Sequence, residues 1–459
     1  MPQKDKLDLT QGKVSSHILR MLGPSSLAIV ALLSAGIIDT IYLGHLTNPD
    51  IPNMGVLALA AVGFAYPLTF IGNSANIGLG AGTLSAVSRA IGRKDIEQAK
   101  RRGTAAMMLA VSFMLIIINV MLLILPNLLD LLGAKGQIKE LAQSYLRITL
   151  PGLVIMSMTS LCANILRARG EAALPSSFMI VNALVNIILD PLLIFGIGPF
   201  PRLEVEGAAL ATFIGYCASS IFALYVVCWR RRAIAFSGMT FGSIKRAWGV
   251  VARVGLPAAG TNIIVPIGAT IAVAIIARFL TIEDVAAFTV AGRAEMLSVA
   301  LLYALSACIG AVTGQNGGAG LSGRVRDTFK FCYFICIMWG TFSAIVLALF
   351  AGPIVSVFTV DTLVISKAKA YFYIVPITVF AYGFVFVSAA GLNALGRPLY
   401  GLCYTIIRSI ILYVLCIYIG VQLHGLTGAF IGIAFANLVS GLTAYLWTMR
   451  RAPMSANIR

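Results

Sequence analysis

Residues 181–196 read VNALVNIILDPLLIFG, an apolar stretch that carries a carboxylate at Asp190. A second acid, Asp39, interrupts another apolar stretch, LSAGIIDTIYLG, at residues 33–44. At the centre of a bilayer an ionisable side chain costs roughly 2.5 to 3.5 kcal/mol on insertion scales, so such residues are rare and usually mark a substrate or ion pathway. The two acids predict ion-coupled transport. The alternative is that each is a carboxyl kept neutral by hydrogen bonds for structural reasons.

The composition of the 459-residue chain is that of a membrane protein. Hydrophobic residues make up 59% of the sequence and charged residues only 11%, far from the balance of a soluble globular protein. An apolar run of about 20 residues is long enough to cross a bilayer as a helix. We therefore predict an all-α polytopic membrane protein with twelve transmembrane helices, near residues 17–45, 55–88, 104–128, 140–166, 174–199, 206–229, 248–280, 286–314, 328–352, 368–395, 399–420 and 426–449.

The net charge of +17 reflects where the basic residues lie. Clusters of Lys and Arg follow the second predicted helix, at residues 93–102, and the sixth, at residues 230–246. This pattern obeys the positive-inside rule if both termini face the cytoplasm, so we predict a multi-pass protein of the cytoplasmic (inner) membrane. No soluble segment exceeds a connector in length, which argues against a nucleic-acid partner. We expect a monomer surrounded by lipid.

The two halves of the chain repeat each other at a shift of roughly 220 to 233 residues. Pro24, which opens the first predicted helix, corresponds to Pro257, which opens the seventh. Each half contains six predicted helices, an even number, so both halves have the same orientation in the membrane and the axis relating them runs along the membrane normal. Further pairs of corresponding landmarks are Tyr145 with Tyr371, Pro151 with Pro376, and Gly207 with Gly428.

This repetition predicts two pseudo-twofold-related six-helix bundles. We place the N-lobe, with helices one to six, at residues 1–229 and the C-lobe, with helices seven to twelve, at residues 248–459. Residues 230–247 are polar and basic and are predicted to link the lobes on the cytoplasmic side. A substrate cavity between two such bundles is the arrangement typical of transporters built from repeats.

The fifth predicted helix carries a polar stripe. Asn182, Asn186 and Asp190 are spaced by four residues and therefore share one helical face. Pro191 lacks an N–H, which leaves the carbonyl of Ile187 free to contact a cation or water beside the carboxylate.

The sixth predicted helix offers facing partners for this stripe in Thr212 and Tyr216, again four residues apart. When the halves are aligned, Asp39 lies opposite Ala272, and the eleventh helix has no acid opposite Asp190. We therefore predict that ion coupling is confined to the N-lobe. Two neighbouring carboxyls suit proton coupling, and the same oxygens in a drier cage would suit Na⁺.

Six motifs distributed over the chain have a characteristic order and spacing. They are IIDTIYLGHL (37–46), IGRKDIEQAKRRG (91–103), NIILDP (186–191), EGAALAT (206–212), AGRAEM (291–296) and GQNGGAG (314–320). Together they resemble the MATE family of multidrug and toxic compound extrusion transporters, particularly its prokaryotic DinF-like branch. The resemblance implies alternating access between two lobes and export of organic cations or amphiphilic drugs in exchange for H⁺ or Na⁺, with no bound cofactor.

The resemblance also assigns residues to an N-lobe cation site. Carried over position by position, it implies that Asp39, Asn186, Asp190 and Thr212 form the site and that Tyr145 and Asn164 lie nearby. Other branches of the family carry acidic coupling residues in the second lobe. Here the seventh helix has no acid before Glu283, which supports coupling in the N-lobe alone. For the mechanism we expect H⁺ or Na⁺ at the two acids to rearrange the first helix around Pro24.

The C-lobe contains three charges near membrane depth, Arg293, Glu295 and Arg408. Arg293 and Glu295 are two residues apart and do not face each other on a helix. We hypothesise that Glu295 pairs with Arg408, either to fix helix packing or to serve gating or substrate binding.

Two other classes of protein are alternatives to an antiporter. A flippase for lipid-linked or amphiphilic substrates would favour a cationic cavity that gathers Arg293 and Arg408. An intramembrane aspartyl protease could use Asp39 and Asp190, but the contexts IIDT and LDPL lack the YD and GxGD patterns of such enzymes. We therefore predict a transporter and not an enzyme.

Overall fold

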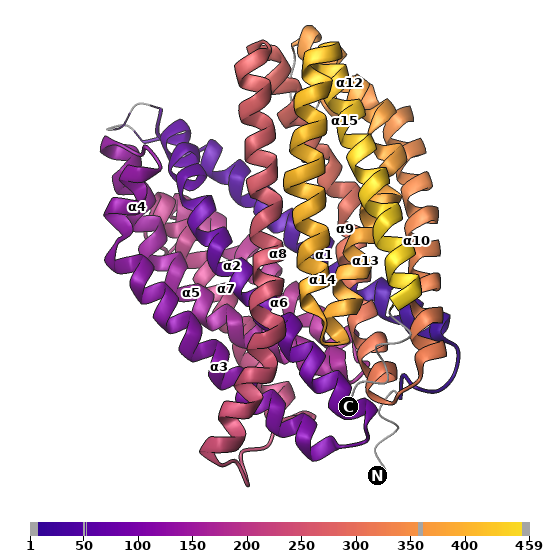
Figure 1. Ribbon diagram of the computed structural model, residues 1–459. Coiled ribbons are helices and arrows are strands. Elements are labelled where there is room, and N and C mark those ends of the chain that lie inside the picture. Colours follow the sequence, from indigo (N-terminus) through magenta and orange to yellow (C-terminus); the bar gives the residue numbers. More distant parts are fainter. Residues whose placement is uncertain (1–7, 49–50, 52, 357–360, 452–459) are drawn as a thin grey trace. The chain divides into compact units, whose positions relative to one another are not determined.

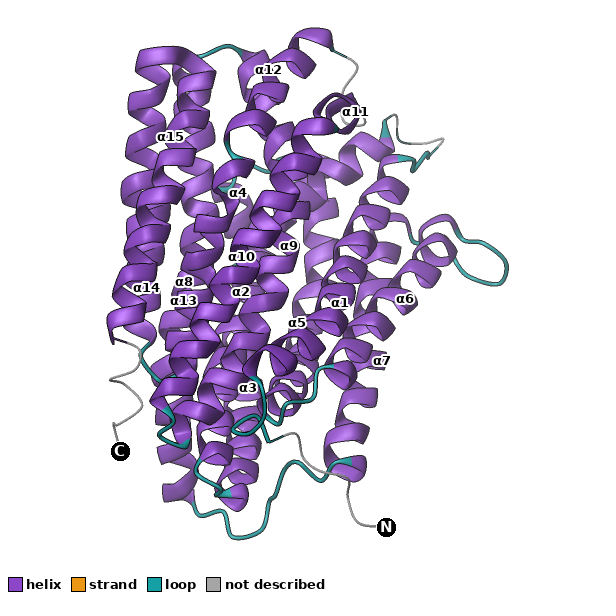
Figure 2. Ribbon diagram, turned by 90° about the vertical axis from the view of Figure 1, so that its right-hand side faces the viewer, coloured by secondary structure: helices purple, strands orange, loops and turns teal. Residues whose placement is uncertain are grey.

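The structure of the chain, a computed structural model, describes residues 8–48, 51, 53–356 and 361–451, without the side chains of residues 293, 294 and 297. Within these ranges the regular secondary structure is helical, and no strand is present (Figure 2). The prediction of an all-α protein is therefore confirmed.

The first half of the chain contains the long helices that were predicted for it and one additional short helix, α4, after the third (Figure 1). A π-helical turn, Val226–Arg230, extends the last of them. The bounds are α1 Val14–Gly44, α2 Met54–Gly92, α3 Ile96–Leu123, α4 Leu125–Leu131, α5 Gly136–Ala168, α6 Ala173–Phe195 and α7 Glu204–Tyr225.

The second half repeats this order, including a short helix, α11, after its third long helix. A 3₁₀ turn, Pro376–Thr378, separates α12 from α13, and a π-helical turn, Ile407–Leu412, separates α14 from α15. The bounds are α8 Phe241–Phe279, α9 Ile282–Gly318, α10 Ser322–Leu349, α11 Ala351–Ser356, α12 Thr362–Ile374, α13 Val379–Ala394, α14 Pro398–Ile406 and α15 Tyr413–Arg451.

The number of membrane spans agrees with the predicted twelve. Among the described residues, 11 continuous helical stretches are long and apolar enough to cross a membrane. The last of these, Pro398–Arg451, contains a break at His424 and Gly425, where Gly425 has φ 59° and ψ −138°. Only glycine adopts this conformation readily, and the break falls between the predicted helices 399–420 and 426–449. Pro398–Arg451 therefore contributes two spans.

The chain divides by its internal packing into two compact units. The first, called the N-unit here, comprises Gly23–Val87 and Asp95–Ala259; the second, the C-unit, comprises the described residues of Met1–Leu22, Ser88–Lys94 and Gly260–Arg459.

Helix α8 begins at Phe241, within the segment 230–247 that we predicted to be an inter-lobe linker. The helix contributes its residues up to Ala259 to the N-unit and the rest to the C-unit. The division into lobes at residues 229 and 248 stays a prediction.

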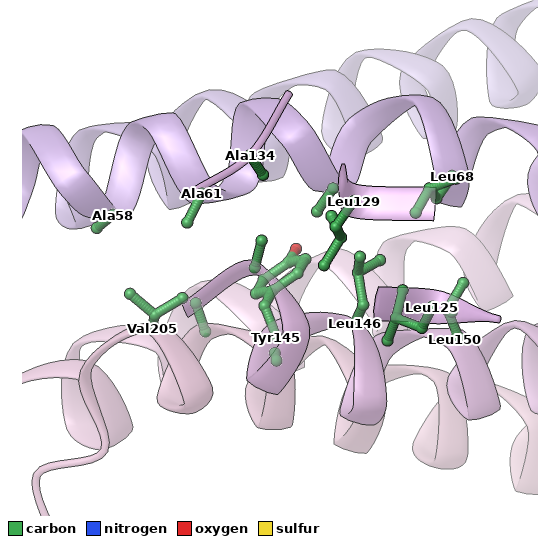
Figure 3. Packing of buried hydrophobic residues seen from close by; sticks show 14 of the residues in the cluster. Ala58, Ala61, Leu68, Leu125, Leu129, Ala134, Tyr145, Leu146, Leu150 and Val205 are labelled. Carbon is green, nitrogen blue, oxygen red and sulfur yellow. The ribbon is translucent and has the colours of Figure 1, made fainter. Parts of the chain in front are cut away.

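The interior of the N-unit is built from small and branched apolar side chains. Leu129, Leu146 and Leu150 are completely buried, and Ala58 and Ala61 of α2 face the same cluster (Figure 3). Small residues let helix backbones approach closely, which is the main source of packing energy between helices inside a membrane. Helix α7 packs against both α5 and α6, and this three-helix contact holds in place the polar residues described below.

The N-terminal segment is fixed to the C-unit by polar contacts. The backbone N–H of Leu9 donates to Gln315 Oε1 at 3.1 Å, and Asn316 Nδ2 donates to the Leu9 carbonyl at 3.0 Å. Arg324 donates to the carbonyls of Leu9, Gln11 and Gly12 at distances of 2.8 to 3.2 Å. Part of the GQNGGAG motif (314–320) therefore holds the start of the chain.

Candidate functional site

The two acids that lie far apart in the sequence meet inside the N-unit. Asp190 of α6 is completely buried, and its carboxyl lies within hydrogen-bonding reach of that of Asp39 from α1. Asn186, one helical turn before Asp190, is 6% exposed and also lies within reach of Asp39. The predicted stripe on one face of this helix thus directs an amide and a carboxyl at the first helix.

Asn186 joins the acids to the neighbouring helix α7. Its Nδ2 donates to Asp190 Oδ1 at 3.2 Å and to Thr212 Oγ1 at 3.2 Å. The four predicted coupling residues, Asp39, Asn186, Asp190 and Thr212, therefore form one connected cluster drawn from α1, α6 and α7.

The cluster is incompletely satisfied by protein groups. Asp39 Oδ1 and Asp190 Oδ2 are buried and have no hydrogen-bond partner among the described residues. A buried carboxyl oxygen without a donor is costly, and in native proteins it usually signals a bound water, ion or functional role. These two carboxyl oxygens are therefore available to bind a cation or a proton.

Two tyrosines border the acids. Tyr145 of α5 interacts electrostatically with Asp39, Asp190 and Tyr216, and Tyr216 of α7 interacts with Asp39. The ring of Tyr216 lies against Gly152, where a Cβ would be 3.0 Å from Cδ2 of the ring. Tyr145 also contributes to the apolar cluster of the unit (Figure 3).

The other residues predicted for this site have separate partners. Asn164 donates to the Ser160 carbonyl at 2.8 Å and packs on Gly80, where its Nδ2 would be 2.5 Å from an added Cβ. Asn182 packs on Gly215 in the same manner, at 2.6 Å from its Oδ1, which has no partner in the described part of the chain. Among the described residues, the hydrogen bonds of these two asparagines do not reach the two acids.

The two predicted prolines lie within helices. Pro24 is in α1, and α6 runs through Pro191 to Phe195. Because Pro191 follows Asp190 directly, the Ile187 carbonyl loses its usual helical donor beside the carboxyl.

In the described ranges, no group of three or more His, Cys, Asp or Glu side chains could hold a metal ion.

The charged residues predicted in the second half lie in the C-unit. Arg408, in the π-helical turn after α14, is 6% exposed, and its guanidinium carbon is 3.4 Å from the ring centroid of Tyr382. Its Nε and Nη2 donate to Asn437 Oδ1 at 3.3 and 3.0 Å, and its Nη1 donates to Ser409 Oγ at 3.3 Å.

Glu295 has two polar neighbours, one of which is Arg408, the partner we hypothesised. Its carboxyl lies within hydrogen-bonding reach of the Tyr371 hydroxyl and interacts electrostatically with Arg408. The hydrogen bonds of Arg408 in the described residues go to Asn437 and Ser409 instead of to a carboxylate. The side chain of Arg293 lies outside the described residues.

Asn437 and Ser409 escaped the sequence analysis. Neither is charged, and each lies in an apolar run where a single polar residue is common. The repeat contained a signal for Asn437, because aligning Gly207 with Gly428 places Tyr216 opposite Asn437. Tyr371, the landmark that corresponds to Tyr145, likewise lies beside an acid.

Comparison with known proteins reveals one family. A model of the MatE family matches residues 24–192 and again residues 257–419. The two matches begin at Pro24 and Pro257, the pair of prolines from which the internal repeat was inferred.

Curated relatives include transporters with different named substrates. The chain is 29% identical over 447 residues to an FAD transporter of Shewanella oneidensis, covering 97% of each protein. It is 24% identical over 413 residues to the multidrug export protein MepA of Staphylococcus aureus, covering 90% of this chain and 88% of that one. It is 24% identical over 368 residues to the probable multidrug resistance protein NorM of Thermotoga maritima, covering 78% and 75%.

Solved structures agree with the fold. The bent form of the Vibrio cholerae MATE transporter VcmN matches with a TM-score of 0.89 and 26% identity, over 97% of this chain and 98% of that one. The outward-facing conformation of a multidrug resistance MATE family transporter matches with a TM-score of 0.92 and 25% identity, over the full length of both chains.

Proposed function

The chain belongs to the MatE family of multidrug and toxic compound extrusion transporters, and on that premise we propose that it exports organic substrates in exchange for an ion bound at Asp39 and Asp190. The observation that carries this proposal is the buried carboxyl pair, with one oxygen of each acid unpartnered. A transporter must bind its coupling ion at a protected site whose affinity differs between its inward and outward states.

We propose H⁺ as the coupling ion. The carboxyls of Asp39 and Asp190 lie within hydrogen-bonding reach of each other, and two carboxyls can share a hydrogen bond only when one of them holds a proton. Losing that proton would leave two adjacent negative charges in a buried site, a strong repulsion in a medium of low polarity. The arrangement supports proton-dependent movement of α1 against α6. Na⁺ remains the alternative, because the unpartnered carboxyl oxygens and Thr212 Oγ1 are hard ligands.

The substrate class has two candidates within the same mechanism. Organic cations and amphiphilic drugs are supported by the relatives named as multidrug exporters. An anionic flavin nucleotide is supported by the relative named as an FAD transporter, which spans 97% of this chain, and by a buried arginine in the C-unit.

Transport into inverted membrane vesicles tests the proposal. Uptake of a fluorescent organic cation and of FAD would be driven separately by a pH gradient and by a Na⁺ gradient, for the parent and for Asp39→Asn. Uptake driven by the pH gradient and lost in the variant would support H⁺ antiport, and dependence on the Na⁺ gradient would replace H⁺ by Na⁺. If neither gradient drives uptake of either compound, antiport is wrong and a flippase for lipid-linked substrates becomes the next candidate.

A further inference from the structure

Arg408 is held in an unusual setting for a charged residue of a membrane protein. It lies in the π-helical turn Ile407–Leu412, a departure from α-helical geometry that is frequent at functional sites. The guanidinium is stacked on Tyr382 at 3.4 Å, and the ring centroid of Tyr413 lies 5.6 Å away. These aromatic contacts stabilise the cation through its face and leave its edges available for hydrogen bonds.

The hydrogen bonds of Arg408 use only part of its capacity. A guanidinium has five N–H donors. Asn437 accepts from Nε and Nη2, and Ser409 accepts from Nη1. These bonds use three of the five N–H donors, and the Tyr382 hydroxyl is a further polar neighbour of the guanidinium. Two donors on adjacent nitrogens of a planar group are the set that binds two oxygens of a phosphate or carboxylate.

The charge of Arg408 is also incompletely balanced. Glu295 interacts with it electrostatically and also lies within hydrogen-bonding reach of Tyr371, but the hydrogen-bond acceptors of Arg408 are the uncharged Asn437 and Ser409. A buried cation that served packing alone would be expected to contact its counter-ion directly, because separation forfeits most of the attraction that offsets desolvation. Arg408 is instead oriented and partly neutralised from a distance.

We infer that Arg408 is an anion-binding residue of the C-unit and takes a phosphoryl group of the exported substrate through its remaining N–H donors. Tyr382 and Asn437 hold the guanidinium in position, and Glu295 is a resident counter-charge that competes electrostatically with the incoming anion. The inference rests on the proposed export function for the step of transport, but it concerns binding and can be tested without transport.

The direct test is equilibrium binding of two flavins to the purified full-length protein in lipid nanodiscs. FAD carries phosphoryl groups and an adenosine, riboflavin has the same ring system without either, and pyrophosphate carries the phosphoryl groups alone, so the three compounds together isolate the contribution of the anion. Inorganic pyrophosphate serves as a competitor. The proteins compared are the parent, Arg408→Gln, Arg408→Lys and Glu295→Gln, each with its melting temperature measured as a check on folding.

We expect Arg408→Gln to weaken FAD binding about tenfold or more, because charged hydrogen bonds to the phosphoryl group are lost. Arg408→Lys keeps the charge but loses the planar pair of donors, so it should fall between the parent and Arg408→Gln. Riboflavin binding should change less than about twofold in both variants, since none of its groups pairs with the guanidinium. Glu295→Gln should bind FAD as tightly as the parent or more tightly, and pyrophosphate should displace FAD from the parent.

Three results would overturn the inference. The first is equal weakening of FAD and riboflavin in Arg408→Gln or Arg408→Lys, which would indicate a packing role. The second is unchanged FAD binding in Arg408→Gln or, should that variant fail to fold, in Arg408→Lys. The third is a parent protein that binds neither FAD nor pyrophosphate. Proton-driven export of an organic cation could persist through all three, so failure of this inference is distinguishable from failure of the proposed function.

Discussion

The N-unit and the C-unit carry polar clusters on corresponding parts of the repeat, but the clusters hold different charged groups: two acids in the N-unit and an arginine with one acid in the C-unit. In the N-unit, Asp39 and Asp190 meet beside Tyr145. In the C-unit, Arg408 lies near Glu295, whose carboxyl lies within hydrogen-bonding reach of Tyr371, the counterpart of Tyr145. The comparison teaches that the repeat preserved the helices and one tyrosine while the charged groups diverged.

The two clusters also solve the problem of burying charge in different ways. Two acids in hydrogen-bonding contact avoid mutual repulsion only by sharing a proton, so the N-unit cluster is suited to binding and releasing H⁺. A guanidinium stays charged at any physiological pH, and its desolvation is offset by stacking on Tyr382 and hydrogen bonds to Asn437. The first arrangement can change its charge during a cycle, whereas the second can only change its partner.

The largest expected effect is the loss of coupling when either acid is neutralised. Asp190→Asn removes the ionisable carboxyl of the acid that is completely buried. Gradient-driven transport should fall about a hundredfold or more, because an amide cannot bind and release the proton on which the coupled step depends. The melting temperature should be retained, because the amide has the same shape. Transport assays in vesicles with Asp190→Asn and Asp39→Asn measure the effect.

A matched control is Asp130→Asn in α4, which removes an exposed acid ion-paired to Lys139 at 2.6 Å. Exposed ion pairs contribute little, so this variant should transport like the parent. If Asp190→Asn were driven by the ion gradient as strongly as the parent, the N-unit cluster would not be the proton-binding site and the contrast with an anion-binding C-unit would be wrong.

The second prediction gives the C-unit a carboxylate in direct contact with its cation. Asn437→Asp is nearly isosteric and places that carboxylate where Oδ1 of Asn437 now accepts two hydrogen bonds from Arg408. A resident ion pair should lower FAD affinity about tenfold, because the anion must compete with a charge-assisted bond, while leaving the melting temperature equal or higher. Unchanged FAD affinity in a folded Asn437→Asp protein would contradict the assigned role of Arg408.

The contrast between the units also explains what the sequence could predict. Asp39 and Asp190 could be found because acids in apolar helices are conspicuous and the spacing of Asn186 from Asp190 indicates a shared face. Asn437 and Ser409 could not, since a lone polar residue in a helix acquires meaning only from what it touches. The helices themselves were predictable from apolar runs, but the short helices α4 and α11 were not, because six or seven residues produce no distinct pattern.

The third prediction concerns the hydrogen bond that ties the N-unit cluster to α7. Thr212→Val removes the hydroxyl that accepts from Asn186 Nδ2 at 3.2 Å and preserves the shape of the side chain. Asn186 keeps its bond to Asp190, so driven transport should fall only about three- to tenfold, the effect of one hydrogen bond of about 1 kcal/mol. Initial rates of driven uptake at several pH gradients measure it.

The appropriate control is Thr69→Val in α2, whose hydroxyl, among the described residues, bonds only the backbone carbonyls of Ala65 and Tyr66 in its own helix. Equal losses in Thr212→Val and Thr69→Val would mean that the effect comes from helix packing and not from the cluster.

The last prediction concerns stability and expects the smallest effect on transport. It changes the two glycines, Gly207 and Gly428, at which the units can be aligned. Gly207 packs against the backbone of Leu193, and its counterpart Gly428 packs still more closely against Gly420, so an added Cβ would overlap a carbonyl oxygen in both. Overpacking of this kind costs roughly 1 to 3 kcal/mol, so Gly207→Ala should lower the melting temperature and Gly428→Ala should lower it further. Gly23→Ala is the control, because nothing lies within 4 Å of its Cβ position and alanine favours the helix. If Gly428→Ala melts like the parent, then close backbone approach is not what the repeat has preserved, and the alignment that places Tyr216 opposite Asn437 loses its structural basis.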